Sequence, residues 1–262
     1  LEPNSFVSVP IPFYKEIKHS LNIFTLKKII NDFRPDLIHI ATEGPLGLYA
    51  RKVCLVEKLK FSSSYHTNFP LYLKKMLGIP VQFTNRFERW FHNAACVTLV
   101  NTPSHKKELE EMGIKKLALW SRGIDENIFF PTPSDRNNSY YLYVGRVSKE
   151  KNLESFLSLE LDKKKVVVGD GPSLKSLKKK YPDVEFLGYK FGRELAEIYS
   201  NACVKVFPSR TDTFGIVMIE ANACGTPVAG YPVTGPIDVV KNGVNGYLNK
   251  DLYQAIKKKK KV

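Results

Sequence analysis

The chain has 262 residues, which is enough for two domains with separate hydrophobic cores. Hydrophobic residues make up 43% of it, as in ordinary globular proteins, and no apolar run approaches the roughly 20 residues of a membrane span. The formal net charge of +14 leaves nucleic acid, an anionic membrane surface and a phosphorylated substrate as candidate partners. No nucleic-acid partner is expected, because the sequence has no basic helix–turn–helix, zinc-finger or aromatic strand motif.

The cysteines are scattered in apolar contexts, with no CxxC pair: Cys54, Cys96, Cys203 and Cys224. This pattern favours reduced core residues over a disulfide framework, and it indicates a cytoplasmic protein. No metal site is predicted. The sequence begins with Leu1 rather than Met and shows no signal peptide, so the native start is expected to be missing.

The first half of the chain alternates apolar runs with amphipathic segments. The apolar runs predict strands at 6–10, 36–40, 61–65, 96–100 and 117–120. The amphipathic segments predict helices at 21–33, 46–59, 71–77, 81–93 and from 102 onward, the last with a serine near its start. This alternation favours an α/β domain with a parallel sheet.

A segment rich in Pro, Asn, Asp and Ser at 121–139 predicts a hinge. A second alternation follows it. Its strands are predicted at 140–144, 165–168, 184–187, 203–207, 226–229 and 246–248. Its helices are predicted at 153–159, 174–180, 194–201, 216–224, 236–240 and from 252 onward. We therefore expect two α/β domains, 1–121 and 122–262.

The stretch 203–225 holds the densest set of candidate site residues. An apolar strand ends at Pro208, and a polar loop leads into a helix. Asp212 lies in the loop, and Glu220 follows eight residues later, two turns into the helix. The N–H groups and dipole at the helix start suit a phosphate, and the carboxylates suit hydroxyl groups. An ordinary strand–loop–helix unit with a solvated Asp and a Glu on the helix face fits this stretch equally well.

Three other loops of the second half also follow predicted strands. Arg146 and Lys151 follow the strand at 140–144. A tight Gly-Asp-Gly-Pro turn at 169–172 follows the strand at 165–168. A loop rich in Gly and Pro at 230–236 follows the strand at 226–229. Ligands of open parallel sheets bind at the carboxyl ends of the strands, so we expect these loops to meet at one edge. Two cations there could clamp a diphosphate. Each loop alone is a weak signal, because such cations are usually solvated and such turns are usually structural.

The combination resembles glycosyltransferase family 4, and the resemblance covers nearly the whole chain. The second half carries GR…K after its first strand, a VGDGP turn, and the two spaced acids within SRTDTFGIVMIEANACGTPV. In the first half, RPDLIHIATEGPLG, SSYHTNFPLYL and VNTPSHKKEL are similar to the GDP-mannose-dependent α-mannosyltransferase branch, and WSRGIDENIFFP resembles its hinge. The resemblance implies a GT-B fold, with two Rossmann-like domains whose parallel sheets face across a cleft. It makes 1–121 the acceptor-side domain and 122–262 the nucleotide-sugar-binding domain.

The same resemblance implies roles for single residues. Arg146 and Lys151 would bind the donor diphosphate, Glu220 the ribose hydroxyls and Asp212 the donor sugar. His66 would lie near the transferred sugar, although a structural histidine is an alternative, and the implied catalytic set is His66, Asp212 and Glu220. The remaining donor-binding positions are Gly145, Gly169, Asp170, Gly171, Thr213, Phe214, Gly215 and Ile216. Glu43 and Gly44 are the implied cleft residues on the acceptor side, and Asn68 and Arg122 are weaker cleft candidates.

The sequence also departs from the family pattern. The first acid is Asp212 where the family usually has Glu, so the reach to a sugar hydroxyl is one methylene shorter. The family's first strand and its Gly-rich loop have no counterpart before Leu1, and its long closing helix has none after Val262. A truncated chain is therefore expected, and its activity alone is an open question.

The resemblance implies a retaining hexosyltransferase. It would move a hexose, with mannose as one candidate, from GDP-mannose or a UDP-hexose to a lipid-linked or glycan acceptor. No DxD metal motif is evident and no cofactor is expected, because two cations can stabilise the leaving diphosphate. Two alternatives stay open: another GT-B enzyme, such as a phosphorylase or a sugar-nucleotide epimerase, and a non-catalytic module that binds sugar nucleotides.

The basic charge suggests a location at the inner face of a membrane. Basic stretches at 15–28, 52–60 and 74–75 were interpreted as parts of helices among apolar residues. Lysines near an anionic surface gain about 1 kcal/mol each, so peripheral binding through the first domain is a hypothesis. The alternative is that these lysines only keep a cytoplasmic enzyme in solution.

Overall fold

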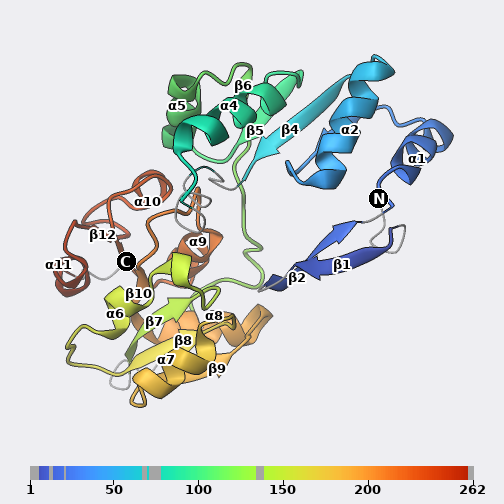
Figure 1. Cartoon of the computed structure of the whole chain (residues 1–262). Coiled ribbons are helices and arrows are strands. Elements are labelled where there is room, and N and C mark those ends of the chain that lie inside the picture. The colour runs from blue at the N-terminus through green and yellow to red at the C-terminus, as the bar shows by residue number, and fades with distance from the viewer. Residues whose placement is uncertain are drawn as a thin grey trace. The chain divides into compact units, whose positions relative to one another are not determined.

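The structure, a computed structural model, describes residues 6–11, 14–20, 22–66, 70, 78–133 and 139–258. The chain divides into two compact units, Leu1–Ser121 and Arg122–Val262, whose elements are labelled in Figure 1. No helix among the described residues is both long enough and apolar enough to span a bilayer.

Unit 1 is built on a parallel four-stranded sheet with the order β3-β4-β5-β6. Its strands are β3 (Ile38–Ile40), β4 (Phe61–Tyr65), β5 (Val97–Val100) and β6 (Leu117–Leu119). Its helices are α1 (Thr25–Phe33), α2 (Pro45–Val56), α4 (Val81–His92) and α5 (Pro103–Met112). The helix predicted at 71–77 lies outside the described residues. The first turn of α5 is capped by the hydroxyl of Thr102, which accepts from His105 N, rather than by a serine.

The interpretation of the basic stretch at 15–28 as helical is wrong for its first part. Residues Tyr14–Ser20 form strand β2, which pairs with β1 (Ser8–Ile11) in an antiparallel hairpin, and α1 begins only at Thr25. The reason is that pairing with β1 gives the backbone of this segment its hydrogen-bond partners, and such tertiary pairing overrides local propensity.

Unit 2 is built on a six-stranded parallel sheet with the order β12-β11-β10-β7-β8-β9. Its strands are β7 (Tyr140–Val144), β8 (Lys165–Val168), β9 (Glu185–Gly188), β10 (Ala202–Phe207), β11 (Val228–Gly230) and β12 (Gly246–Leu248). Its helices are α6 (Glu154–Leu157), α7 (Leu174–Lys180), α8 (Gly192–Asn201), α9 (Ile216–Ala223), α10 (Pro236–Val239) and α11 (Leu252–Lys257), and a 3₁₀ turn spans Lys149–Lys151. The order runs outward from β7 in one direction and from β10 in the other. Adjacent strands β7 and β10 therefore form the topological switch point, where open α/β sheets bind their ligands.

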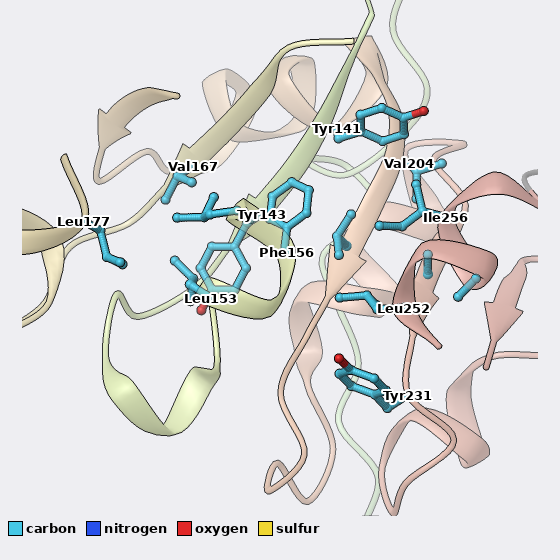
Figure 2. Close-up of a cluster of buried hydrophobic side chains, with 14 of the residues drawn as sticks. Tyr141, Tyr143, Leu153, Phe156, Val167, Leu177, Val204, Tyr231, Leu252 and Ile256 are labelled. Atoms are coloured by element: carbon cyan, nitrogen blue, oxygen red, sulfur yellow. The ribbon is translucent and has the colours of Figure 1, made fainter. Parts of the chain in front are cut away.

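Helices cover both faces of the six-stranded sheet. On one face, side chains from α6, α7 and α11 pack on β7, β8 and β10, and Figure 2 shows Tyr143, Phe156 and Ile256 in this cluster. On the other face, residues of α8 and α9, among them Tyr199 and Met218, pack on the same strands. Burial on two faces explains why these strands are continuous apolar runs in the sequence. The predicted α/β class, with parallel sheets in two Rossmann-like halves, is confirmed.

Candidate functional site

The loop after β7 is held in place from both of its ends. The hydroxyl of buried Tyr143 donates to the carbonyl of Arg146 over 2.7 Å, which fixes the turn directly after the strand. At the far end, Asn152 adopts a left-handed conformation, with φ of 55°, and its amide donates to the carbonyl of Pro208 over 3.1 Å. Pro208 follows β10, so this bond ties together the two loops of the switch point.

A charged pair joins the same two loops. The ammonium of Lys151, after β7, donates to Oδ1 of Asp212, after β10. Both side chains are about three-quarters buried, with 25% and 21% exposure. The structure therefore brings together two residues that the sequence analysis selected, across 61 positions of chain. A cation and a carboxylate already meet where the fold class places its ligands.

The Gly-Asp-Gly turn after β8 packs directly against the loop after β7. A Cβ on Gly169 would lie 2.0 Å from the carbonyl oxygen of Gly145, and one on Gly171 would lie 2.4 Å from that of Val147. The N–H of Val147 donates to the carbonyl of Asp170 over 2.9 Å. These two glycines thus let the two loop backbones approach closely. This structural role does not depend on a ligand. A donor-binding role for this turn stays a proposal.

The loop between β10 and α9 is largely buried. No side chain of this loop caps the start of α9. Thr213 and Phe214 are buried, and Gly215 takes a left-handed φ of 82° just before Ile216 begins α9. A Cβ on Gly235 would lie 2.8 Å from the carbonyl oxygen of Asp212, so the loop after β11 closes against this one. The uncapped N–H groups of the first turn of α9 suit an anion.

Glu220 is held by a residue that the sequence analysis missed. Tyr199 of α8 is fully buried, and its hydroxyl donates to Oε2 of Glu220 over 2.8 Å. Burial raises the pKa of the Glu220 carboxyl, and the bond from Tyr199 partly opposes that rise. No local pattern identifies Tyr199, because it is an ordinary apolar-face residue of an amphipathic helix.

A second missed residue is Lys205, which lies within β10 and has no exposed surface. Its ammonium donates to the carbonyl of Val206 over 3.2 Å and lies 4.6 Å from the centre of the Phe207 ring. Burial lowers the pKa of Lys205 to about 7. Lys205 could have been found in the sequence, because it is a lone lysine inside the run CVKVF. The run itself predicts only a buried strand.

The candidate residues implied near the acceptor and the cleft lie in different settings. His66 directly follows β4, and its ring centre lies 6.3 Å from that of Trp120. Gly44 is the N-cap of α2, and Arg122 is exposed at the start of unit 2. Asn68 lies outside the described residues. The structure gives the place of each of these residues within its own unit. Their roles in a cleft stay proposals.

Glu43 belongs to a buried ionic cluster. Its carboxylate, with 8% exposure, accepts from Nε2 of His92 over 3.0 Å, and Glu88 Oε2 lies 3.3 Å from the same nitrogen. Burial lowers the pKa of His92, but its bonds to the two carboxylates outweigh that effect and leave it raised. The ligand atoms of Glu43, Glu88 and His92 lie within 4.8 Å of one another, the spacing of a metal site. An imidazole Nε2–H that lies between two carboxylates accounts for the cluster without any ion.

Comparison with known proteins identifies the family of this chain. A family model described as "Glycosyl transferases group 1" matches residues 124–259, and one described as "Glycosyltransferase Family 4" matches residues 2–128. The chain is 29% identical to a GDP-mannose-dependent alpha-mannosyltransferase of Corynebacterium glutamicum over 92% of its own length and 62% of that protein. It is also 29% identical to a sulfoquinovosyl transferase of Arabidopsis thaliana, over 92% of its own length and 52% of that protein. It thus spans between about half and two thirds of these curated relatives.

Solved structures show the same fold. Anabaena HepE, crystallised with UDP and glucose, matches 90% of this chain and 70% of its own, with a TM-score of 0.71 and 18% identity. TarM matches 92% of this chain and 51% of its own, with a TM-score of 0.73 and 14% identity. The fold is therefore that of the GT-B glycosyltransferases, and the chain belongs to the glycosyl transferases group 1 family.

Proposed function

We propose that the whole protein transfers a hexose, with retention of anomeric configuration, from a nucleotide-diphosphate sugar to an acceptor. The observation that carries this proposal is the pair formed by Lys151 and Asp212 at the switch point of unit 2, where the fold class binds nucleotides. Unit 2 would then be the donor-binding domain, and unit 1 the acceptor-side domain. The names of the relatives support a sugar-nucleotide donor.

In this mechanism the loops of unit 2 hold the diphosphate as a leaving group. Arg146 and Lys151 supply positive charge, and the uncapped N–H groups at the start of α9 add hydrogen-bond donors. Fixed charges of this kind stabilise the negative charge that develops on the diphosphate as the sugar leaves. Glu220, oriented by Tyr199, would accept from the ribose hydroxyls. The turn at 169–171 would line the same site.

Asp212 is the group proposed to recognise the donor sugar. Its pairing with Lys151 would place a carboxylate beside the diphosphate, where the hexose is attached. His66 of unit 1 is assigned to the transferred sugar by the family resemblance. The leaving phosphate itself would take the proton of the acceptor hydroxyl on the same face of the sugar.

Asp212→Asn tests the proposal. In calorimetric titrations, we expect the wild type to bind GDP-mannose or UDP-glucose, together with the matching nucleoside diphosphate. The substitution should weaken the sugar nucleotide about tenfold, the size of one lost hydrogen bond to a charged group, and change the affinity for the free nucleotide much less. Equal weakening of both ligands would contradict the sugar-recognition role. Failure of the wild type to bind any of these ligands would contradict the proposed function as a whole.

Two other functions would produce different results. A non-catalytic module would bind the donor without transfer, and an epimerase would convert the sugar nucleotide with no acceptor present. The names of the relatives favour transfer, because the two quoted above are both transferases. Mannose from GDP-mannose is the first donor to test, and a lipid-linked or glycan hydroxyl is the proposed acceptor.

A lipid-linked acceptor would require contact with the inner face of a membrane, and a net charge of +14 favours this. We expect the protein to sediment with anionic but not with neutral vesicles, and to be released at about 0.5 M salt, where charges are strongly screened. Equal sedimentation with both kinds of vesicle, or with neither, would contradict peripheral electrostatic binding. A cytoplasmic enzyme with a water-soluble acceptor would then be the better proposal.

A further inference from the structure

Lys205 is an unusual residue for the centre of a parallel strand. It pairs in register with Leu142 of β7 on one side and Val228 of β11 on the other, and its side chain has no exposed surface. An ammonium group has three protons to donate, and among the described residues Lys205 donates one hydrogen bond, to the carbonyl of Val206. Two aromatic rings also lie close to this group. Its nitrogen lies 4.6 Å from the ring centre of Phe207 and 5.6 Å from that of Tyr143.

The position of this ammonium relates it to the donor site. Lys205 lies two residues before the end of β10, and its nitrogen reaches the carbonyl and the ring of the two residues that follow it toward the carboxyl edge. The Tyr143 ring that it faces carries the hydroxyl that supports Arg146. Lys205 thus lies beneath the loops of the switch point.

The charged groups that act on Lys205 are all candidate donor-site residues. Asp212 and Glu220 attract its positive charge, and Lys151 repels it. The attraction of Asp212 is partly offset, because Asp212 is paired with the ammonium of Lys151. Burial therefore dominates and lowers the pKa of Lys205 to about 7.

We propose that Lys205 is a third, buried cation of the donor site, and that it takes up a proton when the donor diphosphate binds. The inference rests on the proposed function, because it needs a diphosphate above β10. The two negative charges of the diphosphate favour the charged form of a nearby amine, and they act strongly on Lys205 because its side chain is fully buried. Lys205 is a positioning residue, which acts on the diphosphate by its charge.

The sign of the pH dependence follows. If the complex holds one more proton than the free protein, raising the pH above 7 must weaken donor binding. Affinity should fall by up to about tenfold per pH unit until the pKa of Lys205 in the complex is reached. Below pH 6 the amine is already protonated in the empty site, so donor affinity should become independent of this group.

Calorimetry measures the proton directly. GDP-mannose and UDP-glucose are suitable probes, because their diphosphate diesters do not titrate near neutral pH. Each is titrated at pH 8 in HEPES and in Tris, which differ in ionisation enthalpy, so the difference in observed heat counts the protons taken up. We expect between about one half and one proton per bound donor at pH 8, and close to none at pH 6.

Two variants identify the group responsible. Lys205→Met keeps a long apolar side chain in the strand, and it should abolish the uptake and remove the pH dependence of the affinity between pH 7 and 9. Lys165→Met is the matched control, since Lys165 is a part-buried lysine at the start of β8 that donates to two carbonyls, and its uptake should equal that of the wild type.

The possible results separate this inference from the proposed function. Donor binding by the wild type without proton uptake overturns the role of Lys205 and leaves the proposed function intact. Uptake that persists in Lys205→Met also overturns it. Absence of binding by either donor overturns both proposals. Thermal unfolding of each variant checks that the protein remains folded.

Discussion

Replacement of Gly169 by alanine should lower the unfolding free energy by more than about 3 kcal/mol, within the range reserved for severe backbone conflicts. The added Cβ would lie 2.0 Å from the carbonyl oxygen of Gly145, a backbone atom that no rotamer change can move. The φ of Gly169 is also +126°, a conformation that alanine rarely adopts. Relief would require separating the loops after β7 and β8, with loss of the bond between Val147 and Asp170.

Urea unfolding followed by circular dichroism measures this effect. Gly188→Ala is the matched control, because Gly188 also has a positive φ, of 70°, but a Cβ there would meet no atom within 4 Å. It should cost only about 1–2 kcal/mol, the strain of a left-handed alanine. If Gly169→Ala and Gly188→Ala had equal urea midpoints, the close approach of the two loops would not explain why position 169 requires glycine.

Replacement of Lys151 by alanine should weaken binding of nucleoside diphosphates between about 10-fold and 150-fold. A charge-assisted hydrogen bond to phosphate contributes about 1.5–3 kcal/mol, and the substitution also leaves the carboxylate of Asp212 without its ammonium partner. Arg146→Ala should fall in the same range, because the guanidinium is proposed to hold the same diphosphate. The measurement is calorimetric titration with GDP and UDP.

Lys149 provides the control within the same short turn. It is exposed, carries the same charge and lies two residues before Lys151, so Lys149→Ala should change the affinity by less than about threefold, as for a screened surface charge. The double variant Lys151→Ala/Asp212→Asn removes both members of the pair. It should bind nucleoside diphosphate better than Lys151→Ala alone, because the unpaired carboxylate that repels the ligand is gone. Equal effects of Lys149→Ala and Lys151→Ala would show that the site senses only total charge.

The order and type of the elements in unit 2 were largely predictable from local patterns. The strands at 140–144, 165–168 and 246–248 and the helix at 174–180 have the predicted bounds, because apolar runs and helical spacing are properties of neighbouring residues. The helix predicted at 153–159 is confined to Glu154–Leu157. In unit 1 the strand β2 was missed, because it exists only through its pairing with β1.

By itself, the sequence determined the parallel α/β class, the loops that follow the strands, and the acidic and basic residues that those loops carry. Only the tertiary structure decided which loops are neighbours, because the strand order places β10 beside β7 although two strands separate them in the chain. Because β10 and β7 are adjacent, Lys151 pairs with Asp212, and Lys205 is fully buried in β10. Contacts over such separations depend on how sheets assemble, which no local pattern records, whereas strand and helix periods depend on residues a few positions apart.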